Sequence, residues 1–565
     1  MGFLSETLHS DVPQRIKHGL IAFILAIGPF LLMALAYLMA ATREIELPGI
    51  YMDAVNPDYL VARWLNPDAQ WIPAWIAPGN DILGSYPLLV GLQHGSLQLW
   101  LSAPFFWVFG MTVVGLRLTH AMFALAVLAA WYAMQRAGGQ SIAITVAIGV
   151  VLAIDPSFVY AFRTQSYITM SPAAFLMLSA VALLQAHGSS GTARLRWLAV
   201  CGVLGGLSCW GYFIYTFFMP ALLAACWLLP GKPATGSARL VHSLMPVLGM
   251  TVGALLYFAG FLLVARHMGG LDEAISYYLS AQPILSAADS AITPSVRLAH
   301  VESSLNMVIM NTWHHYMMFT EWSATPGVFI KYFILIAVPP MLWLVAEWRH
   351  CATPLLRLVM GLQFSFLLVA VLFGPRTSGH HFMAMVPLSY AGLAAALGAH
   401  GATPFPRRTI VLFAAAAIAV GLFVINIAGN KLEIETLRRT GGVAMFSDAN
   451  NQLGKDLLAG SHNRLLILPD WGLYMPTAFL TQASMEMRTH EDFDLARERL
   501  CEGKDVVLVL ITGDRSNRFR QWQTRLDWSA PIVKPYQQRD GKVVFEVATF
   551  TGKDSNTRCA DAQAD

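Results

Sequence analysis

The sequence predicts a polytopic α-helical membrane protein of about 11 transmembrane helices, with interfacial juxtamembrane helices and a C-terminal soluble α/β domain. Of its 565 residues, 56% are hydrophobic and only 13% are charged, whereas soluble domains carry about 25% charged residues. Many separate apolar runs reach the roughly 20 residues that a spanning helix needs. After Asn430 the charge density rises, which predicts a different kind of domain. A net charge of +3 gives no indication of nucleic-acid binding.

Eleven apolar segments are predicted to cross the membrane, and the first is read as an uncleaved anchor because no small-residue cleavage site follows it. The segments are 18–41, 115–136, 140–160, 167–186, 195–210, 212–230, 240–266, 328–346, 355–373, 380–398 and 408–428.

A twelfth apolar run, 88–110, decides the topology. If it does not cross, most loop arginines and lysines fall on the cytoplasmic side, as the positive-inside rule requires. Gln93, His94, Gln98 and Ser102 recur at helical spacing, and Pro104 interrupts the run. We therefore expect an interfacial helix lying on the outer face.

This topology predicts a multi-pass protein of the cytoplasmic (inner) membrane, with a cytoplasmic N-terminus. A transmembrane module over 1–429 then has large external regions at about 42–114 and 267–327. The tail, 430–565, is expected on the periplasmic or extracytoplasmic side.

The tail contains the pattern of a small α/β domain. The runs 464–469 and 505–511 are continuously apolar, as in strands that are covered on both faces, and helical patterns fall at 446–459, 474–484 and 491–502. Residues 542–550 alternate like an edge hairpin strand. Cys501 and Cys559 would meet an oxidising compartment, so they form either a disulfide or two free thiols.

Two carboxylates follow the first predicted span. Asn56-Pro57 has the form of an N-cap followed by proline at the first helical position, which places Asp58 in the first helical turn near the positive end of the dipole. Asp53 lies before that cap and has no such structural reason. It is either a solvated loop acid or a general base held beside a cavity.

Further polar residues mark other external ends. His94 can bind phosphate when charged or donate a hydrogen bond when neutral, or it is simply an interfacial polar residue. Arg163 is the sole basic residue of its loop, where it either pairs with an anion or snorkels to the interface. Asp155 precedes Pro156 and can serve as a helix cap.

The loop 374–381 combines Arg376 with His380 and His381, which predicts an anion site at a membrane exit. Zinc is the rival interpretation, but no nearby carboxylate or cysteine completes a zinc site, so no metal ligand is assigned. His314 and His315 of the long external loop are further candidates, or interfacial helix residues.

These motifs, in this order, resemble the C-type glycosyltransferase (GT-C) superfamily over about the first 400 residues. Within it, the sequence is similar to bacterial members of the dolichyl-phosphate-mannose–protein mannosyltransferase and aminoarabinose transferase type. The matching motifs are Asp53, His94-Gly95, Val108-Phe109-Gly110, Leu116-Arg117, and His380-His381 with Pro387. At the position after His94 the family often has proline, and here it is Gly95.

The resemblance implies an inverting glycosyltransferase that uses a polyprenyl-phosphate sugar donor among membrane lipids. Asp53 would activate a glycolipid, polysaccharide or protein acceptor, and His94, Arg163, Arg376, His380 and His381 would bind the donor phosphate.

Many members also place a second acid shortly after the arginine of the second external loop. Here Arg163 is followed by Thr164 and Gln165, so either Gln165 serves in a reduced role, or Asp155 substitutes, or Asp53 works alone. A divalent cation stays an open alternative that the single acid weakens.

Two other classes compete with the enzyme. A transporter or flippase would fit the number of spans, although the sequence contains neither internal repeats nor paired broken helices. A non-catalytic membrane assembly partner stays open because of the missing second acid.

Overall fold

The computed structural model describes residues 27–70, 77–164, 167–228, 236–280, 292–322, 325–401, 407–460, 463–470, 472–511, 515–552 and 559. Helices occupy all eleven predicted segments. Within the described ranges, five helices are long and apolar enough to cross a membrane, or six if one bent pair is a single span. The protein is thus a multi-pass membrane protein, while the count of eleven stays a prediction.

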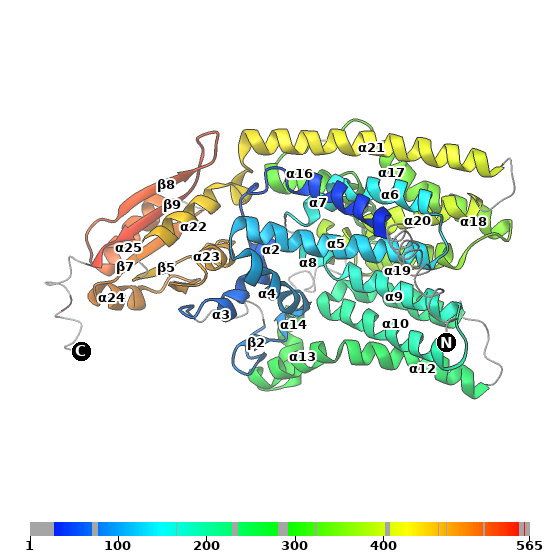
Figure 1. Cartoon of the computed structure of the whole chain (residues 1–565). Coiled ribbons are helices and arrows are strands. Elements are labelled where there is room, and N and C mark those ends of the chain that lie inside the picture. Colours follow the sequence, from blue (N-terminus) through cyan, green and yellow to red (C-terminus); the bar gives the residue numbers. More distant parts are fainter. Residues whose placement is uncertain are drawn as a thin grey trace, which may run out of the picture.

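The long helices form one bundle (Figure 1). They are α5 (Val113–Ala137), α17–η4–α18 (Val328–Tyr332, Phe333–Ala337, Val338–Trp348), α19 (Pro354–Phe373), α20 (Met385–Gly401) and α21 (Arg407–Thr440). The bent pair is α12 (Gly236–Gly253) with α13 (Leu255–Met268), which meet at 50°.

Shorter helices complete the bundle. They are Ile27–Ala41, α6 (Ile142–Ala153), α7 (Pro156–Ala161), α8 (Tyr167–Met170), α9 (Ala173–His187), α10 (Gly191–Gly211), and η2 (Phe213–Phe218) with α11 (Met219–Leu228). The loop after α7 carries Arg163, which the sequence singled out, and η2 follows Tyr212.

The two large segments that the sequence predicts to be external, here named the first and second external segments, gather at one end of the bundle, next to the C-terminal sheet (Figure 1). The first external segment forms α2 (Met52–Val55), η1 (Asp58–Val61), α3 (Ala62–Leu65) and a small hairpin, β1 (Asp81–Ile82) with β2 (Tyr86–Pro87). The second forms α14 (Leu271–Ser280), α15 (Pro294–Ile309) and α16 (Thr312–Phe319).

The sequence predicted one interfacial helix over 88–110, and this prediction is wrong in its first half. It forms a second hairpin, β3 (Leu89–Gly91) with β4 (His94–Gly95), and then α4 (Leu97–Phe109). The predicted polar stripe turns inward: Gln98 and Ser102 are buried, whereas Trp107 and Val108 are exposed. The reason is hydrogen bonding, because Gln98 Nε2 donates to the Gly211 carbonyl at 3.0 Å and Ser102 Oγ donates to Asp58 Oδ1 at 2.7 Å.

The C-terminal chain forms a five-stranded sheet of order β6-β5-β7-β9-β8. The two predicted buried strands exist and are parallel, as β5 (Arg464–Ile467) and β7 (Asp505–Leu510). The three predicted helices are α22 (Ala449–Ala459), α23 (Tyr474–Leu480) and α24 (Phe493–Cys501). Three further elements were not predicted from the sequence: β6 (Glu486–Arg488), α25 (Arg515–Leu526) and β8 (Ile532–Gln537).

The strand predicted at the edge, β9 (Val543–Phe550), is an inner strand, and that prediction is wrong. It pairs antiparallel with both β7 and β8, and the exposed β8 takes the edge. Cys501 and Cys559 form a disulfide, which closes the alternative that the sequence left open.

The two faces of the sheet belong to two different cores. Along β7, Val506 and Leu508 pack with α24 and α25, whereas Val507 and Val509 pack with α22, α23 and the first external segment. In that second core Ala54 and Val55 of α2 are completely buried. The C-terminal sheet and the first external segment therefore share one core and lie on the same side of the bundle (Figure 1).

Candidate active site

The β3–β4 hairpin positions His94 against the segment that joins α10 to η2. The Phe213 backbone N–H donates to the Gln93 carbonyl at 2.9 Å, and Trp210 Nε1 donates to the Leu88 carbonyl at 3.0 Å. A Cβ atom at Gly95 would lie 1.8 Å from the Trp210 carbonyl oxygen. Glycine stands after His94 because the backbone of α10 comes too close for any side chain.

His94, Tyr212, His380 and His381 form what we call the histidine cluster. The His94 ring stacks on the Tyr212 ring with centroids 4.3 Å apart. Tyr212 Oη lies 2.9 Å from His381 Nε2, and the His380 and His381 rings have centroids 4.1 Å apart. Three segments that lie far apart in the sequence thus meet at one place.

Hydrogen bonds fix the tautomer of His381. The Ser378 backbone N–H donates to His381 Nδ1 at 2.8 Å, so the ring proton is on Nε2, which donates to Tyr212 Oη. Ser378 Oγ lies 2.7 Å from His380 Nδ1. Arg376 ends η5 (Gly374–Arg376), which lies in the same short segment as these two histidines.

His94 is a neutral imidazole. Burial, with a smaller contribution from the nearby His380, lowers the pKa of His94 to about 3. Both ring nitrogens are buried, and neither has a hydrogen-bond partner among the described residues. A neutral ring donor with no partner is suited to bind an oxygen atom of a ligand.

Arg163 makes its contacts with residues outside the histidine cluster. Its buried guanidinium donates to the Arg43 carbonyl and lies over the Tyr160 ring, with Cζ 5.7 Å from the ring centroid. It therefore anchors the loop after α7 to the end of the first helix. Gln165, the residue considered as a reduced second acid, lies outside the described residues.

Asp53 stands in α2 and is partly buried. The helix α2 packs against α8. On α8, Thr169 Oγ1 donates to the His380 carbonyl at 3.0 Å. The helix that carries Asp53 and the segment that carries His380 therefore contact the same short element.

Asp58 lies in the first turn of a helix, as predicted, but the predicted cap before it is wrong. Pro57, not Asn56, is the N-cap residue of η1, and no side chain caps that turn. Asp58 is completely buried, and both of its oxygen atoms are bonded: His120 Nε2 lies 2.8 Å from Oδ2, and Ser102 Oγ donates to Oδ1. A carboxylate in the interior needs such partners, which outweigh the weak attraction of a helix terminus.

Asp155 caps α7, as its sequence position suggested, because Oδ1 accepts from the Ser157 N–H at 2.8 Å. It also forms a buried ion pair, with Oδ2 2.7 Å from Lys331 Nζ, and accepts from Tyr390 Oη at 2.6 Å. The sequence contained a signal for this pair, since Lys331 is a lone cation in an apolar run, where a charge needs a partner.

His314 and His315 are buried side chains of α16. His314 Nδ1 lies 2.9 Å from Thr164 Oγ1, and burial lowers the pKa of His314 to about 3. His315 Nδ1 lies 3.1 Å from Glu433 Oε1. In the described part of the chain, no three His, Cys, Asp or Glu side chains are grouped so that they could hold a metal ion.

Comparison with solved structures places this arrangement in a known fold. The chain has the GT-C glycosyltransferase fold. It is similar to ArnT from Cupriavidus metallidurans bound to undecaprenyl phosphate, with a TM-score of 0.55 and 11% identity over 94% of this chain and 98% of that one.

Weaker similarities have TM-scores below 0.5. The Archaeoglobus fulgidus oligosaccharyltransferase in complex with Zn and sulfate gives 0.48 at 13% identity, covering 85% of this chain and 67% of that one. The mycobacterial arabinofuranosyltransferase AftD gives 0.38 at 15% identity, covering 85% and 34%. No family model and no curated protein sequence matches the chain.

Proposed function

We propose that the protein is an inverting membrane glycosyltransferase that transfers a sugar from a polyprenyl-phosphate donor to a glycolipid, polysaccharide or protein acceptor. The observation that carries the proposal is the meeting of His94, Tyr212 and the His380–His381 pair near the helix that bears Asp53. The fold agrees over nearly the whole chain with a protein whose structure holds undecaprenyl phosphate.

In the proposed reaction, Asp53 takes the proton of the acceptor hydroxyl while that oxygen attacks the anomeric carbon. The bond between the anomeric carbon and the phosphate oxygen breaks, and polyprenyl phosphate leaves with the electron pair. Negative charge then grows on the phosphate, where Arg376 supplies a positive charge and the cluster supplies neutral hydrogen-bond donors. Such a leaving group needs donors and positive charge more than it needs a protonating acid.

The burial of the three acids supports Asp53 as the base, because Asp58 and Asp155 are completely buried. The oxygen atoms of Asp58 are bonded to His120 and Ser102, and those of Asp155 to Lys331, Tyr390 and the Ser157 N–H. Asp53 is partly exposed, and its helix is near the cluster. A base must reach the proton that it abstracts, which a fully buried carboxylate cannot do without breaking its own bonds.

The proposed location is the outer face of the cytoplasmic membrane, with the N-terminus in the cytoplasm and 430–565 in the periplasm or its equivalent. The shared core of the C-terminal sheet and the first external segment supports a common side for both. The positive-inside rule supports the outer face for that side.

The test is transfer by the purified full-length protein in nanodiscs, with a panel of radiolabelled polyprenyl-phosphate sugars and a membrane extract as acceptor. Asp53→Asn should lower the transfer rate about 100-fold or more while donor binding persists. Asp272→Asn, which changes an exposed acid on α14, is the matched control and should transfer normally. Full transfer by Asp53→Asn would refute the proposal that Asp53 is the base. A wild-type protein that binds no donor would refute the proposed glycosyltransferase activity.

A further inference from the structure

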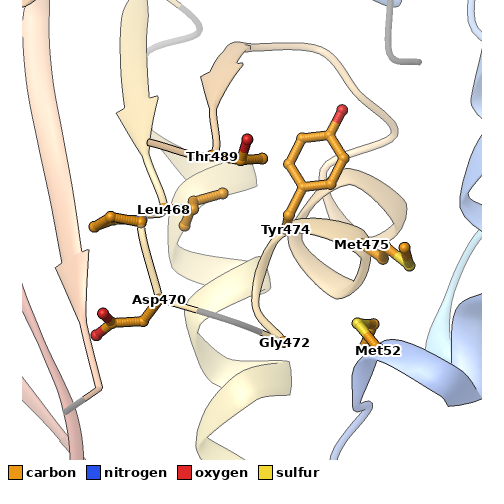
Figure 2. Close-up of a pocket in the computed structure, with 8 residues that line it drawn as sticks. Met52, Leu468, Asp470, Gly472, Tyr474, Met475 and Thr489 are labelled. Carbon is orange, nitrogen blue, oxygen red and sulfur yellow. The ribbon is translucent and has the colours of Figure 1, made fainter. Parts of the chain in front are cut away.

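A pocket of about 110 Å³ lies where the C-terminal domain meets the first external segment (Figure 2). One wall is Met52, the residue immediately before Asp53. The other walls come from the C-terminal domain: Leu468, Pro469, Asp470, Gly472, Tyr474, Met475 and Thr489.

The strand topology explains why a pocket forms there. β5 pairs in parallel with β6 on one side and with β7 on the other. The connection after β5 leads to β6 at one edge, whereas the connection after β7 leads to β8 at the other edge, so the two leave the carboxyl end of the sheet in opposite directions and open a crevice there. Leu468–Asp470 follow β5 directly, and Thr489 follows β6.

The pocket presents a mixed surface. Asp470 lies on one side and the two methionines on the other (Figure 2). Asp470 is held in place, since Oδ2 accepts from the Ile511 N–H at 2.6 Å and Oδ1 from Arg518 Nη1 at 2.9 Å. Thr489 adds a hydroxyl and Tyr474 a ring with a phenol.

This chemistry favours a neutral, hydroxyl-bearing ligand. Asp470 is paired with Arg518, so these two groups carry no net charge and select neither an anion nor a cation. The carboxylate accepts hydrogen bonds from ligand hydroxyls, and the threonine and tyrosine hydroxyls can accept or donate them, while the methionines and the tyrosine ring pack against the C–H faces of a ligand. A sugar unit has both kinds of surface.

The position of the pocket relative to Asp53 is fixed by packing. Gly472 has φ +99°, and a Cβ there would lie 2.6 Å from Cε2 of Tyr51, so the loop after β5 sits directly on the first external segment. Ala54 and Val55 are completely buried in the core that α23 shares. A ligand in this pocket is therefore held at a constant distance from the proposed base.

We propose that this pocket binds a neutral sugar unit of the acceptor, adjacent to the group that reacts. The inference rests on the proposed function, because it assigns the acceptor class of the same site. The C-terminal domain then acts as part of the acceptor site, and the acceptor carries a sugar next to its nucleophile.

Binding can be tested without catalysis. Full-length protein in nanodiscs is mixed with methyl glycosides of glucose, mannose, galactose and N-acetylglucosamine, and saturation-transfer NMR reports which are bound. Met475→Trp fills the pocket and should abolish the signal of the bound glycoside. Thr489→Val, a gentler change, should weaken it, and Thr549→Val on β9 is the matched control that should keep it. No signal in the wild-type protein, or an equal signal in Met475→Trp, would overturn the proposal that this pocket binds a sugar.

Kinetics separate the two proposals. For a wild type that transfers sugar, Met475→Trp should raise the acceptor KM about tenfold or more while the donor KM stays unchanged. An unchanged acceptor KM would overturn the proposal that the pocket binds the acceptor, while the proposed glycosyltransferase activity would stay supported. A wild type that binds methyl glycosides in a Met475-dependent way but binds no polyprenyl-phosphate sugar would support the pocket and refute the proposed function.

Discussion

His120 Nε2 lies 2.8 Å from Asp58 Oδ2, and both side chains are completely buried. His120 Nδ1 also lies 3.2 Å from the Phe162 carbonyl, and Arg117, one turn earlier on α5, donates to the Arg163 carbonyl and to the Pro48 carbonyl. One face of α5 therefore holds two external loops in place. These are the loop that carries Asp53 and the loop that carries Arg163.

Asp58→Ala is expected to destabilise the protein rather than to remove a chemical group. It leaves the buried His120 without its partner, which should cost about 3 kcal/mol or more. Thermal unfolding of the protein in detergent micelles should show a clearly lower Tm. Asp53→Asn is the comparison and should keep the wild-type Tm. If Asp58→Ala kept its Tm and lost transfer, Asp58 would be the better candidate for the base.

His94 should make stability depend on pH. Folded His94 has a pKa of about 3, while its ordinary value is 6.5, so the unfolded chain binds more protons between these values. Stability is then complete above about pH 6.5 and falls as the pH drops toward 3. At pH 5 the loss from this residue is up to about 2 kcal/mol.

The measurement for His94 is Tm at pH 7.5 and pH 5.0. His94→Gln should reduce the difference between the two values, because glutamine does not titrate. His490→Gln changes an exposed histidine and should leave the difference as it is in the wild type. His314, whose pKa is also lowered to about 3, will contribute a remaining slope of the same sign. An unchanged slope in His94→Gln would contradict a neutral, buried His94.

Lys331 and Asp155 should be strongly coupled. Lys331→Met leaves a buried, uncompensated carboxylate and should cost about 3–5 kcal/mol. The double variant Asp155→Asn/Lys331→Met removes both charges, and the asparagine can still bond Ser157 and Tyr390, so part of the loss should return. A double-mutant cycle on Tm or on chemical denaturation measures the coupling. Additive losses would show that the two residues are independent.

The Cys501–Cys559 disulfide should stabilise the C-terminal domain. It closes a loop of sequence separation 58, and removing it by Cys501→Ser/Cys559→Ser should cost about 2–4 kcal/mol. Unfolding of the domain can be followed by limited proteolysis with and without reductant. Cys351→Ser removes a free thiol and should respond to reductant like the wild type. If reductant still increased proteolysis of the double serine variant, the effect of reductant would not come from this disulfide.

Much of the fold could be predicted because its signals are local. Spanning helices follow from runs of apolar residues, and the parallel strands β5 and β7 follow from continuous apolar runs, since both of their faces are covered. Short or polar elements were missed. β8 has an exposed face and contains Pro535, so neither its composition nor its alternation resembles a buried strand.

The site could be predicted only as a set of separate residues. His94, His380 and His381 stood out by their type and place, and the structure brings them together. Tyr212, which joins them, carries no charge and did not stand out, and His120 lies inside an apolar helix where nothing local indicates its partner. These residues gain their roles from contacts made across more than 60 positions of the chain.

The sequence by itself determined that this is a multi-pass helical membrane protein with a C-terminal α/β domain, because hydropathy and strand pattern are properties of the chain at each position. Only the tertiary structure decided which acid is buried and which stays accessible. Asp53 and Asp58 are five positions apart and have the same side chain, but Asp58 is completely buried against His120 and Ser102, whereas Asp53 is partly exposed. Burial and hydrogen-bond partners depend on packing between distant segments, and no local pattern encodes them.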